Sequence, residues 1–194
     1  MGNVSEETVI IGLCGAACTG KTTLAERLQG LGSSVVMVAQ GARELSQQTS
    51  FGPVWDVIDA IGALNLEAYL IGHWRLLEFL RRCSRPGSLI VTDTTPLDDL
   101  AYCDLLVGDE NQAVIRFLTE QALRHLRSYT RIYFLPAGVF PFVTDEVRTR
   151  NTQGEHERII QELSIKYDIE MVRIETSSVE ERVEEILVDI AGLR

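Results

Sequence analysis

One short run of residues carries a chemistry that its types and spacing specify. Residues 15–22 match the phosphate-binding pattern G-x-x-x-x-G-K-S/T at every fixed position. In such a run, backbone N–H groups point together at phosphate oxygens, and the positive end of the following helix favours the negative charge. The members of this phosphate loop are Gly15, Ala16, Ala17, Cys18, Thr19, Gly20, Lys21 and Thr22.

In a loop of this pattern, which binds a nucleotide such as ATP, different residues have different tasks. Gly15 and Gly20 allow the turn and a close approach of the backbone. Lys21 reaches the β- and γ-phosphates, and the Thr22 hydroxyl holds Mg²⁺. Thr23 either stabilises the helix start or contacts another phosphate. The alternative is a chance glycine turn before a helix, which the flanking sequence disfavours.

The flanking sequence supplies the elements that such a loop requires. Residues 9–13 are apolar and rich in β-branched side chains, which predicts a buried strand. Leu24 and Leu28 then repeat at helical spacing after the loop. Strand, glycine loop and helix therefore follow one another in the required order.

A carboxylate stands where a phosphate-binding protein needs one for its metal. Asp93 follows a predicted strand at residues 88–91, and it could hold Mg²⁺ directly or through water. The alternative is that Asp93 caps the next helix, a task that Thr94 or Thr95 could also perform.

Two arginines lie in a loop rich in proline and charge, predicted at residues 136–154. Arg148 and Arg150 could bring guanidinium groups onto a transferred phosphoryl group as a lid. Arg158, on the next predicted helix, could face the same site. Solvated pairing of the two arginines with Asp145 and Glu146 is an equal alternative.

A second substrate would bind between the second strand, at residues 35–38, and the helices within residues 53–82. Arg43, Trp55 and Asp56 are candidate substrate contacts there, since aromatics stack on bases and carboxylates bind hydroxyls. Glu44 is the preferred carboxylate for the acceptor. Trp55 alone is more often a core residue.

Helices and strands alternate along the chain. Further strands are predicted at residues 131–135 and 171–174, and helices at 65–82, 96–107, 112–126, 156–167 and 179–191. This alternation predicts an α/β fold with a parallel sheet covered on both faces. We expect one domain over residues 1–194, with its core at about 8–190. The inner face of the last helix is predicted to comprise Val183, Ile186, Leu187 and Ile190.

Composition limits the classes of partner. The 194 residues carry a net charge of −10, which argues against general binding of nucleic acid. The N-terminus does not resemble a signal peptide, and no apolar run is long enough to span a membrane. Cysteines 14, 18, 83 and 103 form no Cys-x-x-Cys pair, so we expect thiols in a cytoplasmic protein.

Four motifs in order resemble NadR-like AAA-type P-loop domains, which include ribosylnicotinamide kinases. These are the phosphate loop, residues 42–44 (Ala-Arg-Glu), residues 92–94 (Thr-Asp-Thr) and residues 141–148. The resemblance implies a three-layer P-loop NTPase fold with a five-stranded parallel sheet of order 2-3-1-4-5. It also implies that Lys21 and Thr22 bind phosphates and Mg²⁺, Asp93 is the strand carboxylate and Arg148 is a lid arginine. The family's lid has Asp-Gly-x-Arg, whereas Glu146 replaces the glycine here.

Two function classes follow from these observations. The first is a kinase that transfers the γ-phosphoryl group of ATP·Mg²⁺ to a nucleoside-like acceptor, such as nicotinamide riboside or another nucleoside or nucleotide. The second is an ATPase or GTPase switch that acts through a protein partner, although the guanine-specific Asn-Lys-x-Asp pattern is absent. The candidate acceptor region and the arginine loop favour the kinase. The choice between ATP and GTP stays open, and so does the formation of a homodimer.

Overall fold

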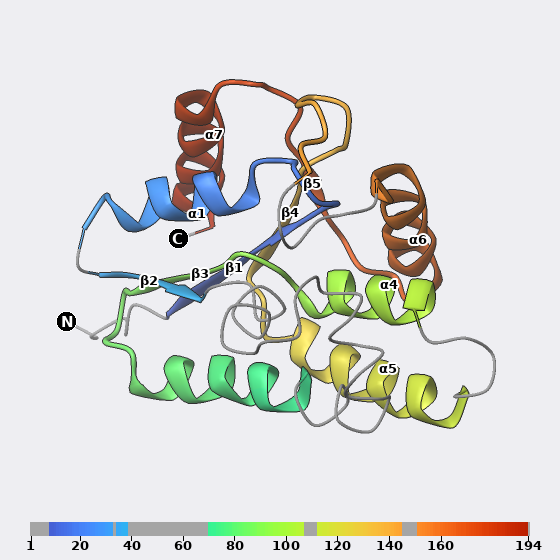
Figure 1. Cartoon of the computed structure of the whole chain (residues 1–194). Helices are drawn as coiled ribbons and strands as arrows, with labels where there is room; N and C mark the ends of the chain where they lie inside the picture. Colours follow the sequence, from blue (N-terminus) through green and yellow to red (C-terminus); the bar gives the residue numbers. More distant parts are fainter. Residues whose placement is uncertain (1–7, 33, 39–69, 107–111, 145–150, 194) are drawn as a thin grey trace.

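The chain forms a twisted sheet between two layers of helices (Figure 1). The computed structural model describes residues 8–32, 34–38, 70–106, 112–144 and 151–193. Its strands are β1 (Val9–Cys14), β2 (Val35–Val38), β3 (Leu89–Thr92), β4 (Arg131–Phe134) and β5 (Val172–Arg173). All the pairs are parallel, and the order is β2-β3-β1-β4-β5. The predicted fold class and strand order are therefore confirmed.

The helices divide between the two faces of the sheet. They are α1 (Lys21–Gln29), α4 (Pro96–Leu106), α5 (Gln112–Leu126), α6 (Gln153–Lys166) and α7 (Val179–Gly192), with a further helical stretch at residues 70–83. In Figure 1, α1 and α7 lie on one side, and α4, α5 and the 70–83 helix lie on the other. The predicted start of α6 at His156 is wrong, because this helix begins at Gln153.

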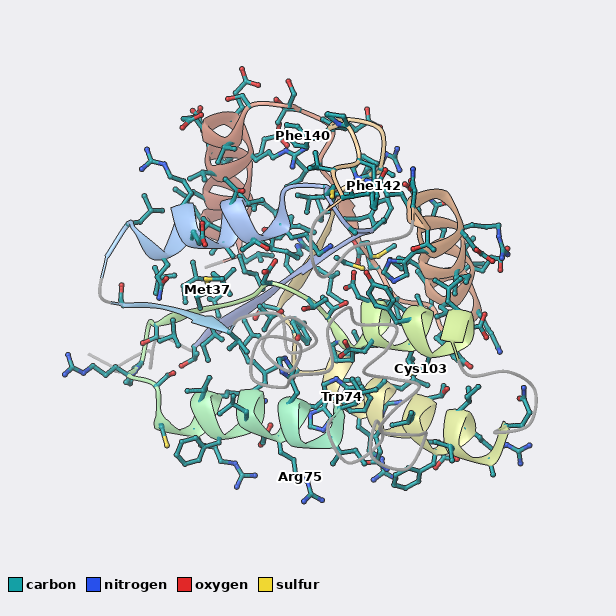
Figure 2. All side chains as sticks on the ribbon, in the orientation of Figure 1. Met37, Trp74, Arg75, Cys103, Phe140 and Phe142 are labelled. Atoms are coloured by element: carbon teal, nitrogen blue, oxygen red, sulfur yellow. The ribbon has the colours of Figure 1, made fainter. Side chains whose placement is uncertain are left out.

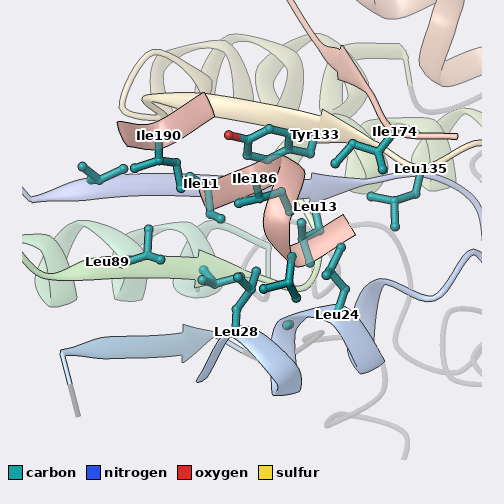
Figure 3. Packing of buried hydrophobic residues seen from close by; sticks show 14 residues of the cluster. Ile11, Leu13, Leu24, Leu28, Leu89, Tyr133, Leu135, Ile174, Ile186 and Ile190 are labelled. Carbon is teal, nitrogen blue, oxygen red and sulfur yellow. The ribbon is translucent and has the colours of Figure 1, made fainter. Parts of the chain in front are cut away.

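The core between the sheet and the α1/α7 layer is built from aliphatic side chains (Figure 3). Leu13 of β1, Leu28 of α1 and Ile186 of α7 are fully buried within one cluster. Each such side chain contributes roughly 1.5–3 kcal/mol through burial. This layer fixes α1, and therefore the loop that precedes it, against the end of β1.

One prediction for the inner face of α7 is wrong. Leu187 is 39% exposed, whereas Arg182 is only 1% exposed. Val183, Ile186 and Ile190 are buried as predicted. Arg182 precedes Val183 and lies one turn before Ile186, so the arginine belongs to the buried face of the helix. An arginine on such a face is expected at the surface, and its burial requires a specific reason.

The opposite layer contains the largest buried side chain of the described residues. Trp74 of the 70–83 helix packs with Leu100 of α4 and Leu118 of α5. Figure 2 places Trp74 between these helices. Its indole nitrogen donates a hydrogen bond to Asp99 of α4, at 2.8 Å. The 70–83 helix is thereby fixed to the start of α4.

Gly12 marks where β1 is crowded from the α4 side. A Cβ at this position would lie 2.5 Å from Thr95 Cγ2 and 2.7 Å from the ring of Tyr129. Neither neighbour has space to move, since Thr95 is fully buried and Tyr129 contacts Thr92. Glycine therefore allows the close packing of β1 against the turn that leads into α4.

Gly12→Ala and Gly72→Ala are expected to change stability in opposite directions. At Gly12 the added methyl overpacks the interior and lowers the free energy of unfolding by about 1–3 kcal/mol. At Gly72, within the 70–83 helix, a Cβ meets no atom of the described residues within 4 Å, so alanine raises stability by about 0.8 kcal/mol. Denaturant midpoints at an unchanged m-value measure both effects. Equal effects at the two positions would contradict this packing.

Candidate functional site

The phosphate loop has a backbone that only glycine tolerates at two positions. Gly15 has φ 144° and Gly20, which precedes α1, has φ 89°. A Cβ at Gly15 would lie 2.3 Å from the carbonyl oxygen of Leu135, after β4. The loop therefore lies directly against the carboxyl end of the neighbouring strand. Cys18 also has a positive φ, of 60°.

Lys21 bends back over the loop from the first turn of α1. Its Nζ donates to the carbonyl oxygens of Gly15, at 2.5 Å, and Ala16, at 2.8 Å. The side chain is buried. These bonds use two of the three N–H donors of the ammonium group, so one remains for a phosphate oxygen.

Three further side chains bind carbonyls of the loop, one from within the loop and two from helices outside it. Thr19 Oγ1 donates to Ala16 O at 3.0 Å, and Gln153 Nε2 of α6 donates to Ala17 O at 2.6 Å. Arg182 Nη1 of α7 donates to Thr19 O at 2.8 Å. Because a trans peptide group is planar, fixing a carbonyl also fixes the N–H at its other end. The outer contacts thus orient the amides that would bind an anion.

Thr22 and Asp93 meet at the carboxyl ends of β1 and β3, although they are far apart in the sequence. Thr22 Oγ1 donates to Asp93 Oδ2 at 2.7 Å, and the Asp93 side chain is almost fully buried. A hydroxyl and a carboxylate in contact fit Mg²⁺, which takes oxygen ligands and usually completes its shell with substrate phosphates and water. Among the described residues, no group of three or more His, Cys, Asp or Glu side chains could hold a metal by itself.

Asp98 is a functional candidate that sequence reasoning missed. Its Oδ1 accepts from the Gly15 N–H at 2.8 Å, and its Oδ2 accepts from Thr95 N at 2.9 Å and Thr95 Oγ1 at 2.7 Å. Thr95 directly precedes Pro96, the first residue of α4, so it takes the capping position that the sequence also allows for Asp93. The spacing Thr95-x-x-Asp98 resembles a capping box and could have drawn attention to Asp98.

His156 connects α6 to Asp98 of α4. Its Nε2 lies 3.2 Å from the backbone oxygen of Asp98, and because a carbonyl only accepts, Nε2 carries the proton. The ring lies 4.0 Å, centroid to centroid, from that of Tyr102. Burial is the main cause that lowers the pKa of His156 to about 4, and Lys21 adds to this. The imidazole is therefore neutral at physiological pH.

Several predicted site residues lie outside the described part of the chain. These are Arg43, Glu44, Trp55, Asp56, Arg148 and Arg150. Their predicted roles stay predictions. Arg158 lies on α6, is exposed, and pairs with Glu162 at 2.6 Å. The described part brings together the phosphate loop, Thr22 and Asp93, to which it adds Asp98, Gln153, His156 and Arg182.

Asp99, beside Asp98 on α4, has an unusual carboxyl group. Burial raises its pKa from 3.8 to about 7; the hydrogen bond from Trp74 opposes this rise and the charge of Asp98 adds to it. Tyr102, Cys103 and Tyr129 also lie within electrostatic reach of this carboxyl. Because the pKa in the folded state exceeds the unfolded value, folding favours the protonated acid, and this contribution is lost as pH rises from about 4 to about 7.

Asp99→Asn is therefore expected to gain stability relative to the wild type as pH rises through that window. The difference changes by at most about 1.4 kcal/mol per pH unit. The opposite effect of His156, whose lowered pKa costs stability as pH falls, is present in both proteins and cancels. Urea unfolding of the two proteins from about pH 4 to 8 measures the difference. Asp104→Asn, on the exposed side of α4, is the control, and a pH-independent difference for Asp99→Asn would contradict the raised pKa.

The strand order, the loop between β1 and α1, and the Thr22–Asp93 contact define a P-loop protein with a kinase-like fold. A family model described as AAA domain matches residues 10–182. The chain belongs to this family. None of the curated proteins compared with the sequence matches it.

Solved structures of other proteins have a similar fold. A structure of NadR protein in complex with NAD and AMP-PNP has a TM-score of 0.73 at 14% identity, over 92% of this chain and 48% of that one. NadR in complex with NR gives 0.65 at 14% identity, over 86% and 43%. Shikimate kinase from Acinetobacter baumannii in complex with shikimate gives 0.57 at 14% identity, over 97% and 96%. This chain thus spans less than half of the NadR chains.

Proposed function

We propose that the protein is an ATP-dependent phosphotransferase that acts on the hydroxyl of a small, nucleoside-like acceptor. One observation carries the proposal: buried Lys21 and the Thr22–Asp93 pair lie together at the end of the glycine loop. This arrangement provides a cation and oxygen ligands at the place where a nucleoside triphosphate would bring its β- and γ-phosphates. Phosphoryl transfer requires mainly such positioning and charge neutralisation.

In the proposed reaction, the loop and the residues that contact it have separate tasks. The loop amides bind the phosphates, and Lys21 gives its remaining N–H donor to a β- or γ-phosphate oxygen. Thr22 and Asp93 hold Mg²⁺, which neutralises phosphate charge when it is bound. Asp98 and Lys21 hold the two ends of Gly15, so that the loop keeps its shape while the ligand changes.

The acceptor side of the proposal rests on residues outside the described ranges and on the relatives. Glu44 is the proposed carboxylate for the acceptor, with Arg43, Trp55 and Asp56 as substrate contacts. Arg148 and Arg150 are the proposed lid cations. The NadR structure in complex with NR makes nicotinamide riboside the first acceptor to test. The described residues contain no helix with the length and apolar character needed to cross a membrane.

Lys21→Ala is expected to remove most of the stabilisation that ATP gives the folded protein. A ligand at about a hundred times its Kd raises the free energy of unfolding by about 2.7 kcal/mol, and without the ammonium group most of this gain is lost. Melting temperatures with ATP or GTP and Mg²⁺, alone and with nicotinamide riboside, deoxynucleosides and nucleoside monophosphates, measure the effect. Arg27→Ala, which removes an exposed cation from the same helix, is the matched control.

The same panel separates the proposed kinase from a switch. A kinase shows an additional shift with one acceptor and forms ADP only when that acceptor is present. If nucleotide stabilises the protein but no acceptor adds to the shift, and turnover stays slow with all of them, the proposed transfer is wrong and a switch is favoured. If wild-type protein gains no stability from ATP or GTP, the nucleotide site itself is wrong.

Thr22→Val is expected to remove most of the stimulation of turnover by Mg²⁺. Valine keeps the shape of threonine but lacks the hydroxyl, so kcat falls by about a hundredfold. Thr22→Ser restores the hydroxyl and should recover activity, while Thr22→Val still binds nucleotide without metal. Initial rates across a Mg²⁺ titration provide the measurement. Equal Mg²⁺ dependence in the valine and serine variants would exclude Thr22 as a ligand.

A further inference from the structure

Arg182 is a buried cation at the phosphate loop. Its side chain is 1% exposed, and its Nη1 and Nε donate to the carbonyl oxygens of Thr19, at 2.8 Å, and Thr176, at 2.6 Å. Within the part of the chain that the structure describes, its Nη2 is buried without a hydrogen-bond partner. The guanidinium carbon lies 5.0 Å from the centroid of the ring of Phe140, a residue of the loop after β4 (labelled in Figure 2).

No carboxylate of the described residues forms an ion pair with Arg182. Glu185, one turn further along α7, acts on it only through space and is exposed to solvent. Carbonyl dipoles and an aromatic ring stabilise a cation, but they do not neutralise its charge. Burying a charge without a counter-ion is costly, so buried charges are normally paired. The cost is acceptable where an anionic ligand completes the pair.

The position of Arg182 indicates which ligand that is. The Thr19 carbonyl that it binds belongs to the same peptide group as the N–H of Gly20, the residue that caps α1. Arg182 Nη1 also lies 3.1 Å from where a Cβ on Gly20 would be. The guanidinium group therefore lies against the N-terminal end of α1, where amides and the helix dipole already favour negative charge.

We infer that Arg182 is a charge that recognises the polyphosphate of the nucleotide, with the bound phosphates as the counter-ion that its burial otherwise lacks. This inference rests on the proposed function, since it assumes that the loop binds a nucleotide. Arg182 acts in two ways. It orients the Thr19–Gly20 peptide group so that the N–H is held for the anion, and it adds a positive charge that water does not screen.

Gln153 provides an internal comparison for the two actions. It also binds a loop carbonyl from outside, that of Ala17 at 2.6 Å, but it carries no charge. Replacing Gln153 therefore removes peptide orientation alone, whereas replacing Arg182 removes orientation and charge together. The contribution of the charge is the part that grows with the charge of the ligand and falls with salt.

The test compares the variants Arg182→Gln, Arg182→Lys and Gln153→Met with the wild type. Binding of pyrophosphate, ADP and adenosine is measured by calorimetry in low and high salt. Arg182→Gln should bind pyrophosphate and ADP about tenfold more weakly, or worse, because it loses the positive charge near the phosphates and the charge-assisted hydrogen bond that fixes the Thr19–Gly20 peptide group. Adenosine binding should not change, and the salt dependence for pyrophosphate should be shallower. Arg182→Lys should lose less affinity than Arg182→Gln and keep the salt dependence of the wild type, since it keeps the charge but not the fork of donors.

Two control variants separate the charge of Arg182 from the loss of any arginine and from the loss of peptide orientation. Arg173→Gln removes an exposed arginine of β5 that is paired with Glu175, and it should leave all three affinities unchanged. Gln153→Met should weaken ADP binding without changing its salt dependence. If adenosine loses as much affinity as ADP in Arg182→Gln, or if no ligand loses any, the inference is overturned.

The outcomes also distinguish this inference from the proposed function. If the wild type binds ADP and pyrophosphate but Arg182→Gln binds them equally well, only the inference fails. If the wild type binds neither, the proposed function fails as well. Should Arg182→Gln not fold, Arg182→Lys decides: a salt dependence of pyrophosphate binding as steep as that of the wild type supports the recognition charge, and a shallower one overturns it.

Discussion

The structure depends on Gly15 being held at both its N–H and its carbonyl group. The Gly15 N–H is bound by Asp98 of α4, and its carbonyl is bound by Lys21 of α1. The residue has no space for a side chain, because the backbone of Leu135 lies where a Cβ would be. Strand β1, its neighbour β4 and the helices α1 and α4 can keep their positions only if this residue is glycine with a positive φ. The geometry of the phosphate loop follows from that constraint.

The loop is held by helices that lie on different sides of it. Asp98 comes from α4, Gln153 from α6 and Arg182 from α7, and each side chain reaches a different backbone group of the loop. A loop rich in small residues has little packing of its own, so these contacts limit its conformations. Positioning of this kind lowers the cost of reorganisation when charge changes during a reaction. The buried polar groups around the loop therefore serve its shape as well as its charge.

Regular periodicity made much of the fold predictable from the sequence. The apolar strand before the loop, β2 and the 15-residue helix α5 follow local patterns, and their predicted positions agree closely with the structure. The phosphate loop was predictable because its chemistry needs fixed residue types at fixed spacing. The strand order followed from the family that the motifs resemble, since alternation alone does not order a sheet.

The residues around the loop were not predictable because their contacts are distant in sequence. Asp98 binds a residue 83 positions away, Gln153 one 136 positions away and Arg182 one 163 positions away. No local pattern reports such pairs, and arginine on an amphipathic helix is usually a surface residue. For the same reason the apolar pattern of α7 favours Leu187 over Arg182 for the core. The pattern of α6 likewise predicts a helix start after Gln153.

The order of synthesis gives the Arg182 contact a further consequence. The phosphate loop leaves the ribosome early, at about 5–20 residues per second, whereas α7 follows more than 150 positions later. For most of that interval of several seconds or more, the nascent loop has neither Gln153 nor Arg182 to orient its carbonyls. The carbonyl of Thr19 therefore takes its final orientation only after α7 has been made and has packed against α1.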